Sequence, residues 1–225
     1  MNINDAYSIG LMSGTSLDGL DLVYVKLNTQ HYQDFEIIHA DTIPYSKKWK
    51  AILQKSIDFS KNDLIQLDLE YGQLLANRVT DFIEKYAITK IDFIASHGHT
   101  VLHQPEKGIT LQIGNGQVLA NKTKHKVVCD FRSQDVALGG QGAPLVPVGD
   151  ALLFSEYKYC INLGGFSNVS YQKDGERIAF DICPVNIVMN FYASKLGMEY
   201  DDNGALASKG KLNHTLLERL NQLDY

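Results

Sequence analysis

Cysteine, proline and long apolar runs are scarce in this sequence, and it has no block of basic residues. Its 225 residues include 3 cysteines and 5 prolines, and 21 Lys and Arg stand against 26 Asp and Glu, which gives a net charge of -5. A chain without a basic surface is poorly suited to bind nucleic acid or anionic lipid. We therefore expect a small-molecule ligand, and neither nucleic acid nor a membrane as a partner.

The cysteines and the N-terminus also argue against export or membrane insertion. An odd number of cysteines without C-x-x-C spacing does not form a disulfide framework. Their apolar surroundings predict buried thiols in a reducing compartment. The first residues lack a basic region followed by an apolar stretch, and no uncharged apolar run is long enough to span a bilayer. We expect a cytoplasmic protein with three free thiols, Cys129, Cys160 and Cys183.

Residues 9–25 combine two apolar runs with a turn rich in glycine and hydroxyl groups, which predicts two strands joined by a short turn. Such a turn can hold an anion, because glycines let backbone N–H groups approach it and a carboxylate such as Asp18 can bind magnesium. An ordinary hairpin is the alternative. Two standard motifs are excluded: no Gly-Lys-Ser/Thr follows the turn, and Asp18 replaces the last glycine of G-x-S-x-G.

The next region alternates between strand and helix periodicity. A third strand at 35–43 extends the hairpin into an antiparallel meander. The other elements predicted up to residue 129 are helices at 48–56, 62–86 (capped by Ser60 or Asn62) and 115–122, strands at 91–96 and 127–129, and extended structure within 101–113. Ligands gather beyond the C-terminal ends of parallel strands, so polar residues at 96–99 and 130–135 are expected near a site.

A junction at 138–147 carries three glycines and two prolines, so it predicts a hinge or domain boundary rather than a helix. Beyond it, residues 159–171 repeat the strand, glycine turn and strand of the opening stretch, and 177–182 supply a third strand. Helices are predicted at 185–196 and 213–223. The repeat predicts a duplicated, two-lobed protein whose two turns clamp one polyphosphate, with chance recurrence as the alternative.

Six blocks of the sequence together resemble the anhydro-N-acetylmuramic acid kinases. They occur in order along nearly the whole chain, and several are long and unusual. The blocks are Met-Ser-Gly-Thr-Ser-Leu-Asp-Gly-Leu-Asp at 12–21, Ser-His-Gly-His-Thr-Val at 96–101, Leu-Gln-Ile-Gly-Asn at 111–115, Asp-Phe-Arg-Ser-Gln-Asp-Val-Ala at 130–137, Gly-Gly-Gln-Gly-Ala-Pro-Leu-Val-Pro at 139–147 and Asn-Leu-Gly-Gly at 162–165.

The resemblance implies an α/β, two-lobed actin-like or hexokinase-like ATPase fold with mixed, ribonuclease H-like sheets. Residues 1–148 would form the N-terminal lobe with the first phosphate-binding hairpin. Residues 149–225 would begin a second lobe with the second hairpin, incomplete because family members are longer. The implied reaction uses ATP and magnesium to convert 1,6-anhydro-N-acetylmuramic acid to N-acetylmuramic acid 6-phosphate with hydrolytic ring opening, in peptidoglycan recycling.

The resemblance also implies roles for particular residues. The general base falls on Asp181, although from its position alone this residue could equally bind magnesium or cap a helix. Asp18 and Asp181 are the expected magnesium ligands. Sugar contacts are expected from His97, Arg132 and Asp135. The expected ATP contacts are Gly14, Thr15, Ser16, Asp18, Gly19, Asp21, Gly164, Gly165, Ser167 and Asn168.

One departure and two alternatives accompany this reading. The family pattern after the general base is Thr-Gly-Pro-Gly, whereas Ile182, Cys183 and Val185 stand here around the shared proline, which puts contacts from glycine backbone at 183 and 185 in doubt. A binding-only fragment is the main alternative, and its exposed second lobe would favour a homodimer. A metal-dependent hydrolase using His97, His99 and His103 is the remote one.

Overall fold

The computed structural model describes residues 4–14, 17–142 and 145–223. The chain divides into two compact units, with the boundary between Ser155 and Glu156. Both units are of the α/β class. The first contains a mixed six-stranded sheet and the second a three-stranded sheet, as the predicted ATPase-like fold requires.

The sheet of the first unit begins with the predicted meander of β1 (Asp5–Ser13), β2 (Gly19–Asn28) and β3 (Phe35–Pro44), all antiparallel. Strand β4 (Phe93–Gln104) runs parallel to β1. On its other edge, β4 pairs with two strands in succession. Its first half pairs with parallel β6 (Val127–Cys129), and its second half with antiparallel β5 (Ile109–Ile113).

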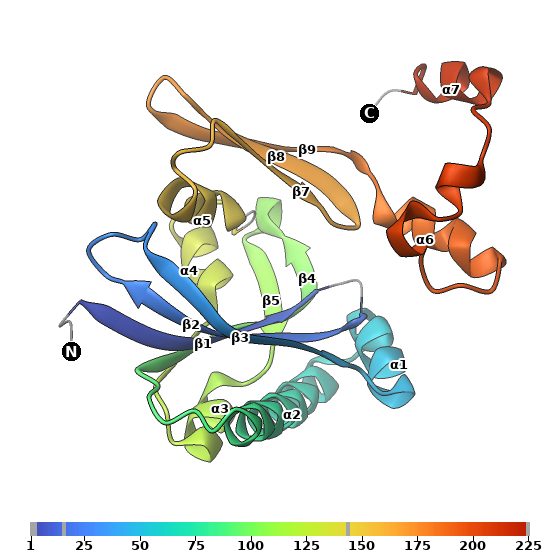
Figure 1. Cartoon of the computed structure of the whole chain (residues 1–225). Helices are drawn as coiled ribbons and strands as arrows, with labels where there is room; N and C mark the ends of the chain where they lie inside the picture. Colours follow the sequence, from blue (N-terminus) through green and yellow to red (C-terminus); the bar gives the residue numbers. More distant parts are fainter. Residues whose placement is uncertain (1–3, 15–16, 143–144, 224–225) are drawn as a thin grey trace. The chain divides into compact units, whose positions relative to one another are not determined.

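Helices cover both faces of this sheet (Figure 1). Helices α2 (Lys61–Lys85) and α3 (Gly116–Thr123) pack together on one face, while α4 (Phe131–Ala137) and α5 (Val146–Leu153) lie on the other. Helix α1 (Lys47–Lys55) and a short 3-10 turn at Ser56–Asp58 precede α2, and another turn at Pro105–Lys107 joins β4 to β5. Of the two predicted caps of α2, Ser60 is the one found, since its side chain accepts from Asp63 N–H.

The core of the first unit lies between the sheet and α2. The apolar residues that recur every three or four positions in α2 are its contribution to this core. Each fully buried Leu or Phe contributes about 1.5–3 kcal/mol before conformational entropy is counted. The buried residues include Ile9, Leu11, Leu20, Leu22, Ile94 and Ile113 from the sheet and Tyr71, Leu75, Val79 and Phe82 from the helix.

Three predictions about this unit were wrong in detail. Strand β4 was expected to end at Ser96, but it continues through His97 and His99 because β5 pairs with its second half. Helix α5 begins at Val146, inside the stretch expected to be a helix-free junction, with its proline in the first turn, where the missing N–H is tolerated. Helix α4 at 131–137 was not predicted.

The second unit repeats the antiparallel meander as β7 (Tyr159–Leu163), β8 (Phe166–Lys173) and β9 (Glu176–Pro184). Helices α6 (Asn186–Lys195) and α7 (His214–Leu220) follow, with 3-10 turns at Asp202–Gly204 and Ala207–Lys209 between them. The predicted order of strands and helices is therefore confirmed in this unit.

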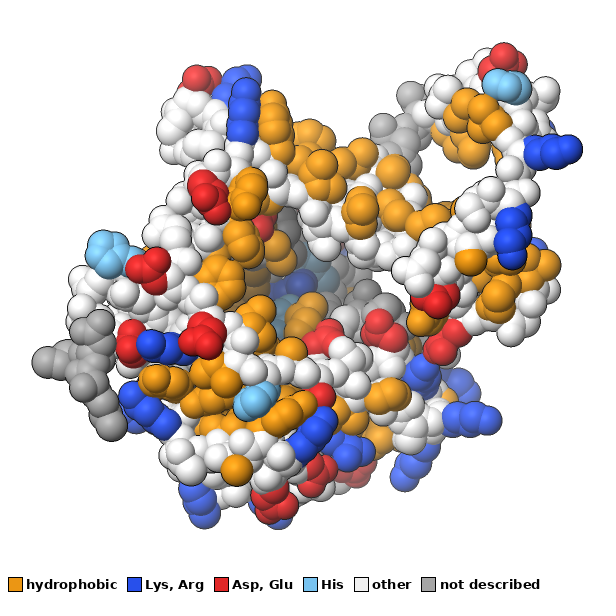
Figure 2. All heavy atoms as spheres, viewed as in Figure 1, with side chains coloured by type: hydrophobic (Ala, Val, Ile, Leu, Met, Phe, Trp, Pro, Cys, Tyr) orange, Lys and Arg blue, Asp and Glu red, His pale blue; other side chains and the backbone are white. Residues whose placement is uncertain are grey.

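Apolar side chains lie open to solvent over this second unit (Figure 2). Alternate residues of β7, namely Tyr159, Ile161 and Leu163, are 54%, 63% and 64% exposed. Among the residues described in the unit, the buried apolar side chains are Val169 and Ala193. The sheet of this unit thus presents a largely uncovered apolar face.

The cysteines differ from the prediction of buried thiols. All three are free, but Cys129 and Cys183 are exposed and Cys160 is partly exposed. Cys129 ends the three-residue strand β6, and Cys160 and Cys183 belong to the uncovered sheet of the second unit. Apolar neighbours in the sequence therefore did not predict burial of these three cysteines. No helix in the described ranges combines the length and apolar character needed to cross a membrane.

Candidate functional site

Between β1 and β2, the described residues on either side of positions 15 and 16 are hydrogen-bonded to each other. Leu17 N–H donates to the carbonyl of Gly14 at 3.3 Å, and the exposed Asp18 accepts a hydrogen bond from Gly19 N–H through Oδ1 at 3.0 Å. Leu17 has a φ of 58°, in the left-handed region that non-glycine residues rarely adopt. Two of the expected ATP contacts, Thr15 and Ser16, lie outside the described residues.

Two other residues expected to contact ATP have clear structural roles in the meander. A Cβ atom on Gly19 would lie 2.7 Å from the carbonyl oxygen of Ile43, so the close approach of β2 to β3 requires glycine there. Asp21 accepts a hydrogen bond from the hydroxyl of Thr42, directly opposite it on β3, at 2.6 Å. These contacts explain both residue types without a ligand.

Beneath the turn, a set of buried polar side chains was missed by the sequence analysis. Ser13, the last residue of β1, lies 2.9 Å from Nδ1 of His99 and accepts a hydrogen bond from the hydroxyl of Tyr45 at 2.8 Å. The hydroxyl of Tyr45 lies 2.5 Å from that of Tyr71. Burial lowers the pKa of His99 to about 4 and raises the pKa of Tyr45 and Tyr71. The sequence carried one sign of this set. Ser13 continues the alternation of Ile9 and Leu11, whose side chains point into the core, so a buried serine could have been expected.

His97 and Arg132 are brought together from β4 and α4. Burial lowers the pKa of His97, and the positive charge of Arg132 acts in the same direction, against the hydrogen bond that Nδ1–H donates to the carbonyl of Gly98 at 3.0 Å. Burial also lowers the pKa of Arg132, and its Nε has no hydrogen-bond partner among the described residues. A buried donor without an acceptor is costly, and a ligand oxygen would satisfy it.

A small cavity of about 50 Å³ adjoins His97. Ser96 and Gln112 line it, and Ser96 Oγ and Gln112 Oε1 are buried atoms without hydrogen-bond partners in the part of the chain that the structure describes. Polar side chains in the lining of a cavity fit a polar occupant rather than an apolar one.

Asp135, the third expected sugar contact, organises the turn after α4. Its Oδ2 accepts from Gly142 N–H at 2.6 Å, and its backbone carbonyl accepts from Gly140 N–H at 2.8 Å. The side chain is exposed. Asp135 therefore has a structural role that does not depend on a sugar.

In the second unit, the start of α6 holds the glycine turn between β7 and β8. Val185 N–H and Ile187 N–H donate to the carbonyl of Gly165 at 2.8 and 3.2 Å, and Asn186 N–H donates to the carbonyl of Gly164 at 3.2 Å. In a trans peptide, C=O and N–H point in opposite directions. Because the carbonyl of Gly164 faces α6, Gly165 N–H points away from that helix and can face an anion.

Neither of these two glycines is required by the fold. A Cβ atom on Gly164 would lie 3.4 Å from its nearest neighbour, the Phe166 carbonyl oxygen, and one on Gly165 would lie 3.9 Å from Ile187 Cβ, both ordinary contacts. Neither glycine has a positive φ. The space that side chains would occupy is open beside a backbone N–H, which is what close approach of a phosphate needs.

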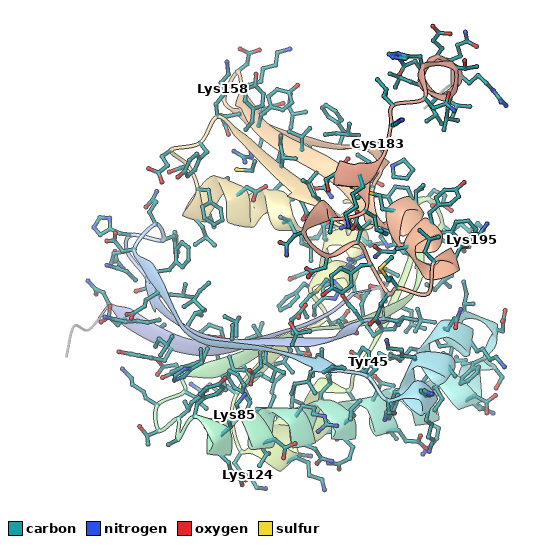
Figure 3. The ribbon with its side chains drawn as sticks, turned by 45° about the vertical axis from the view of Figure 1, so that its right-hand side comes forward. Tyr45, Lys85, Lys124, Lys158, Cys183 and Lys195 are labelled. Carbon is teal, nitrogen blue, oxygen red and sulfur yellow. The ribbon has the colours of Figure 1, made fainter. Side chains whose placement is uncertain are left out.

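Asp181 lies within β9, inside the strand predicted at 177–182, and the pairing of β8 with β9 extends that strand as far as Pro184. Its carboxylate is exposed. The nearby Ser167 is buried, and its hydroxyl donates to the carbonyl of Cys183 at 3.1 Å (Cys183 is labelled in Figure 3). Asp181, Asn168 and Ser167 are thus carried by one pair of strands.

The departure from the family pattern does not place a side chain on left-handed backbone. Neither Cys183 nor Val185 has a positive φ, and Val185 has φ -126° and ψ -94°. Val185 N–H still holds the glycine turn through the carbonyl of Gly165.

The histidines do not form a metal centre. Within the described ranges, no group of three or more His, Cys, Asp or Glu side chains could hold a metal ion. His99 pairs with Ser13, and Nδ1 of His103 lies 3.3 Å from the hydroxyl of Thr110. The geometry gives the metal-dependent hydrolase no support. The exposed carboxylates of Asp18 and Asp181 are hard oxygen donors of the kind that magnesium prefers, and they belong to different units.

Comparison with known proteins gives a consistent result. The family model for anhydro-N-acetylmuramic acid kinase matches residues 6–225. Curated proteins of that name from Bacillus thuringiensis subsp. konkukian (strain 97-27) and Bacillus cereus (strain 03BB102) are 35% and 34% identical over 94% of this chain. The chain spans 60% of the length of each. Among solved structures, YeaZ from Pseudomonas aeruginosa covers 80% of this chain and 67% of its own at 13% identity, with a TM-score of 0.30, too low to support a conclusion.

Proposed function

The chain belongs to the anhydro-N-acetylmuramic acid kinase family, and on that premise we propose that it takes part in converting 1,6-anhydro-N-acetylmuramic acid to N-acetylmuramic acid 6-phosphate in peptidoglycan recycling. Water opens the anhydro ring, and the 6-oxygen of the sugar receives the γ-phosphoryl group of ATP. The match over residues 6–225 is the observation that carries this proposal. The chain spans 60% of the length of its relatives, and its own catalytic activity belongs to the proposal.

ATP phosphates would be held by the two glycine turns. In the first, Gly14 and Asp18 flank Thr15 and Ser16. In the second, Gly165 N–H points away from α6, and a Cβ atom on Gly165 would have its nearest contact at 3.9 Å. Gly164, Ser167 and Asn168 shape this second turn and the strands beside it. Such backbone donors are preorganised for a phosphate and lose little freedom on binding it.

Magnesium would be held by Asp18 and Asp181. When bound, it would neutralise phosphate charge during the transfer. We propose that residues 1–148 act as the N-terminal lobe and 149–225 as the start of the second.

The sugar would bind at His97, Arg132 and Asp135. The buried Nε of Arg132 lacks a partner among the described residues, and a guanidinium pairs well with a carboxylate such as the lactyl group of the sugar. His97 donates from Nδ1 to Gly98, which leaves Nε2 to accept from a sugar hydroxyl.

Asp181 would act as the general base. Its carboxylate takes a proton from water while the water oxygen attacks the anomeric carbon. The bond between that carbon and the 6-oxygen then breaks, and the released oxygen attacks the γ-phosphorus, from which ADP departs. Ring opening and phosphoryl transfer are thereby linked through one oxygen atom.

The test is ADP release from the purified chain with magnesium and ATP, measured with and without the anhydro sugar and paired with calorimetric binding of each. Sugar-dependent ADP formation is the expected result. Sugar binding without turnover would favour the alternative, a binding-only fragment. Absence of both binding and turnover, by a chain shown to be folded, would reject the proposed function.

A further inference from the structure

Four buried polar side chains form a continuous hydrogen-bonded chain under the first turn. Tyr71 from α2, Tyr45 from the β3–α1 junction (Figure 3), Ser13 from the end of β1 and His99 from β4 are only 0%, 8%, 2% and 3% exposed. Successive distances are 2.5, 2.8 and 2.9 Å. We name these residues the Ser13 chain. They join four separate elements at the point where β1 ends.

The hydrogen bonds of the Ser13 chain have one consistent direction. Tyr45 donates its proton to Ser13, so Tyr71 must donate to Tyr45. The hydroxyl proton of Ser13 is then available for Nδ1 of His99. Burial disfavours the charged form of His99, so the imidazole is neutral at neutral pH. With Ser13 as the donor, Nδ1 accepts and the imidazole proton is on Nε2.

A local irregularity brings His99 into this position. The β1–β4 register shifts between Leu11 and Ser13, with Ser96 opposite Leu11 and His99 opposite Ser13. One extra residue is therefore accommodated on β4, and Gly98 has a φ of 69° there. A β-bulge of this kind re-aims side chains at functional sites.

We infer that the Ser13 chain positions the first phosphate-binding turn, with Tyr45, Tyr71 and His99 acting through Ser13 as positioning residues. The inference rests on the proposed function of that turn. Ser13 directly precedes Gly14, whose carbonyl accepts from Leu17 N–H. Leu17 has a left-handed backbone that is unfavourable for leucine, so the surrounding structure must hold it there. A fixed Ser13 supplies one of the anchors of the turn.

The test compares Tyr45→Phe with Tyr24→Phe in the full 225-residue chain. Tyr24 is a matched control because it is also buried, and its hydroxyl donates to the Lys90 carbonyl at 2.8 Å, within the same unit but outside the Ser13 chain. Amide exchange of Leu17 and the tautomer of His99 are read by NMR. Binding of ATP is measured by calorimetry.

In Tyr45→Phe, Leu17 N–H should exchange about tenfold faster, because the anchor of the turn is loosened. Ser13 would also lose its donor, so the reverse bond from Nδ1–H of His99 becomes competitive and a mixture of tautomers should appear. Affinity for ATP should fall about tenfold. Tyr24→Phe should leave all three unchanged. A change of tautomer is a signature that simple loss of stability does not produce.

The outcomes separate this inference from the proposed function. If Leu17 exchange and the His99 tautomer are unchanged in Tyr45→Phe, or if ATP affinity is unchanged although the turn loosens, the inference is overturned. If the turn loosens but ATP fails to bind even the unaltered chain, the result supports the Ser13 chain as the anchor of the turn. It rejects the proposal that the turn binds phosphate. Should Tyr45→Phe not fold, Tyr71→Phe removes only the bond to the Tyr45 hydroxyl and keeps the Tyr45–Ser13–His99 bonds. Leu17 exchange should then rise and ATP affinity fall by less than about tenfold, while the His99 tautomer stays unchanged; unchanged exchange and affinity would overturn the inference.

Discussion

Asn168 lies directly opposite Asp181 in the antiparallel pairing of β8 and β9, and the register shifts immediately beside them. Ser167 is opposite Cys183, so Ile182 is an extra residue in β9. The backbone on either side of Asp181 is therefore fixed by strand pairing, while its carboxylate is exposed. A side chain that makes a small contribution to folding but sits on a rigid strand is well placed to act on a substrate.

Asp181→Asn should abolish ring opening and phosphorylation together while leaving the fold intact, because it removes the proposed base without changing shape. Product analysis by mass spectrometry and the thermal unfolding midpoint provide the measurements. Asp174→Asn is the matched control, since it alters an exposed Asp in the β8–β9 turn. Normal turnover by Asp181→Asn would eliminate this residue as the base.

Gly165→Ala should weaken ATP binding by about tenfold, because its methyl group would occupy the space beside the donors of the second turn. Stability should change by no more than about 0.5 kcal/mol, since the added Cβ has its nearest contact at 3.9 Å. Calorimetry and urea unfolding would measure the two effects. Unchanged affinity would remove the second turn from the ATP site.

Gly19→Ala is the contrasting substitution in the first unit. Its Cβ would lie 2.7 Å from the Ile43 carbonyl oxygen, so β2 and β3 must separate to admit it. We expect a loss of about 1–3 kcal/mol in the free energy of unfolding, measured in urea. Full stability of this variant would show that the strand contact is not what requires glycine.

Arg132→Lys should lower affinity for the anhydro sugar by about tenfold or more, because a lysine lacks the planar fork and the Nε donor. Arg78→Lys is the control. Its guanidinium pairs with Asp81 at 3.2 Å on the exposed face of α2, where such pairs contribute little. Equal loss in both variants, or loss in neither, would remove Arg132 from the sugar site.

Stability should fall as pH drops from 6.5 toward 4. Burial lowers the pKa of His99 to about 4 from 6.5, so in this window the unfolded chain binds the proton more tightly than the folded one. The free energy of unfolding has its full value above pH 6.5 and falls by up to about 3 kcal/mol as the pH drops toward 4. Urea unfolding at several pH values, compared with His99→Gln, isolates this contribution. A variant with the same pH slope as the unaltered chain would contradict it.

Local periodicity was enough to predict most elements, and it failed where distant segments decide the outcome. Helix α2 follows from spacing alone, while its cap was left open between Ser60 and Asn62 and is Ser60 in the structure. The length of β4 depends on β5 pairing with residues 99–104, and the extension of β9 beyond residue 182 to Pro184 depends on pairing with β8. Neither pairing can be recognised from the residues of the strand itself.

The residues of the candidate site were likewise predicted only in part. His97 and Arg132 were predicted together, and the structure places them together. The Ser13 chain was missed because its members are scattered over residues 13–99, and His99 was considered as a polar residue near the site or as a metal ligand, not as a partner of Ser13. Buried polar networks are assembled by tertiary packing, so the alternation that turns Ser13 inward was the only local sign of one.

The parallel pairing of β1 with β4 sets an order of events during synthesis of the chain. Tyr7 and Asp92 exchange hydrogen bonds of 2.8 Å in both directions although they are 85 positions apart. The β1–β2–β3 meander leaves the ribosome first, so one edge of β1 waits unpaired until β4 has been made. An open strand edge is a template for association with other chains. The edge of β1 that pairs with β4 therefore stays open while α2 is being synthesised.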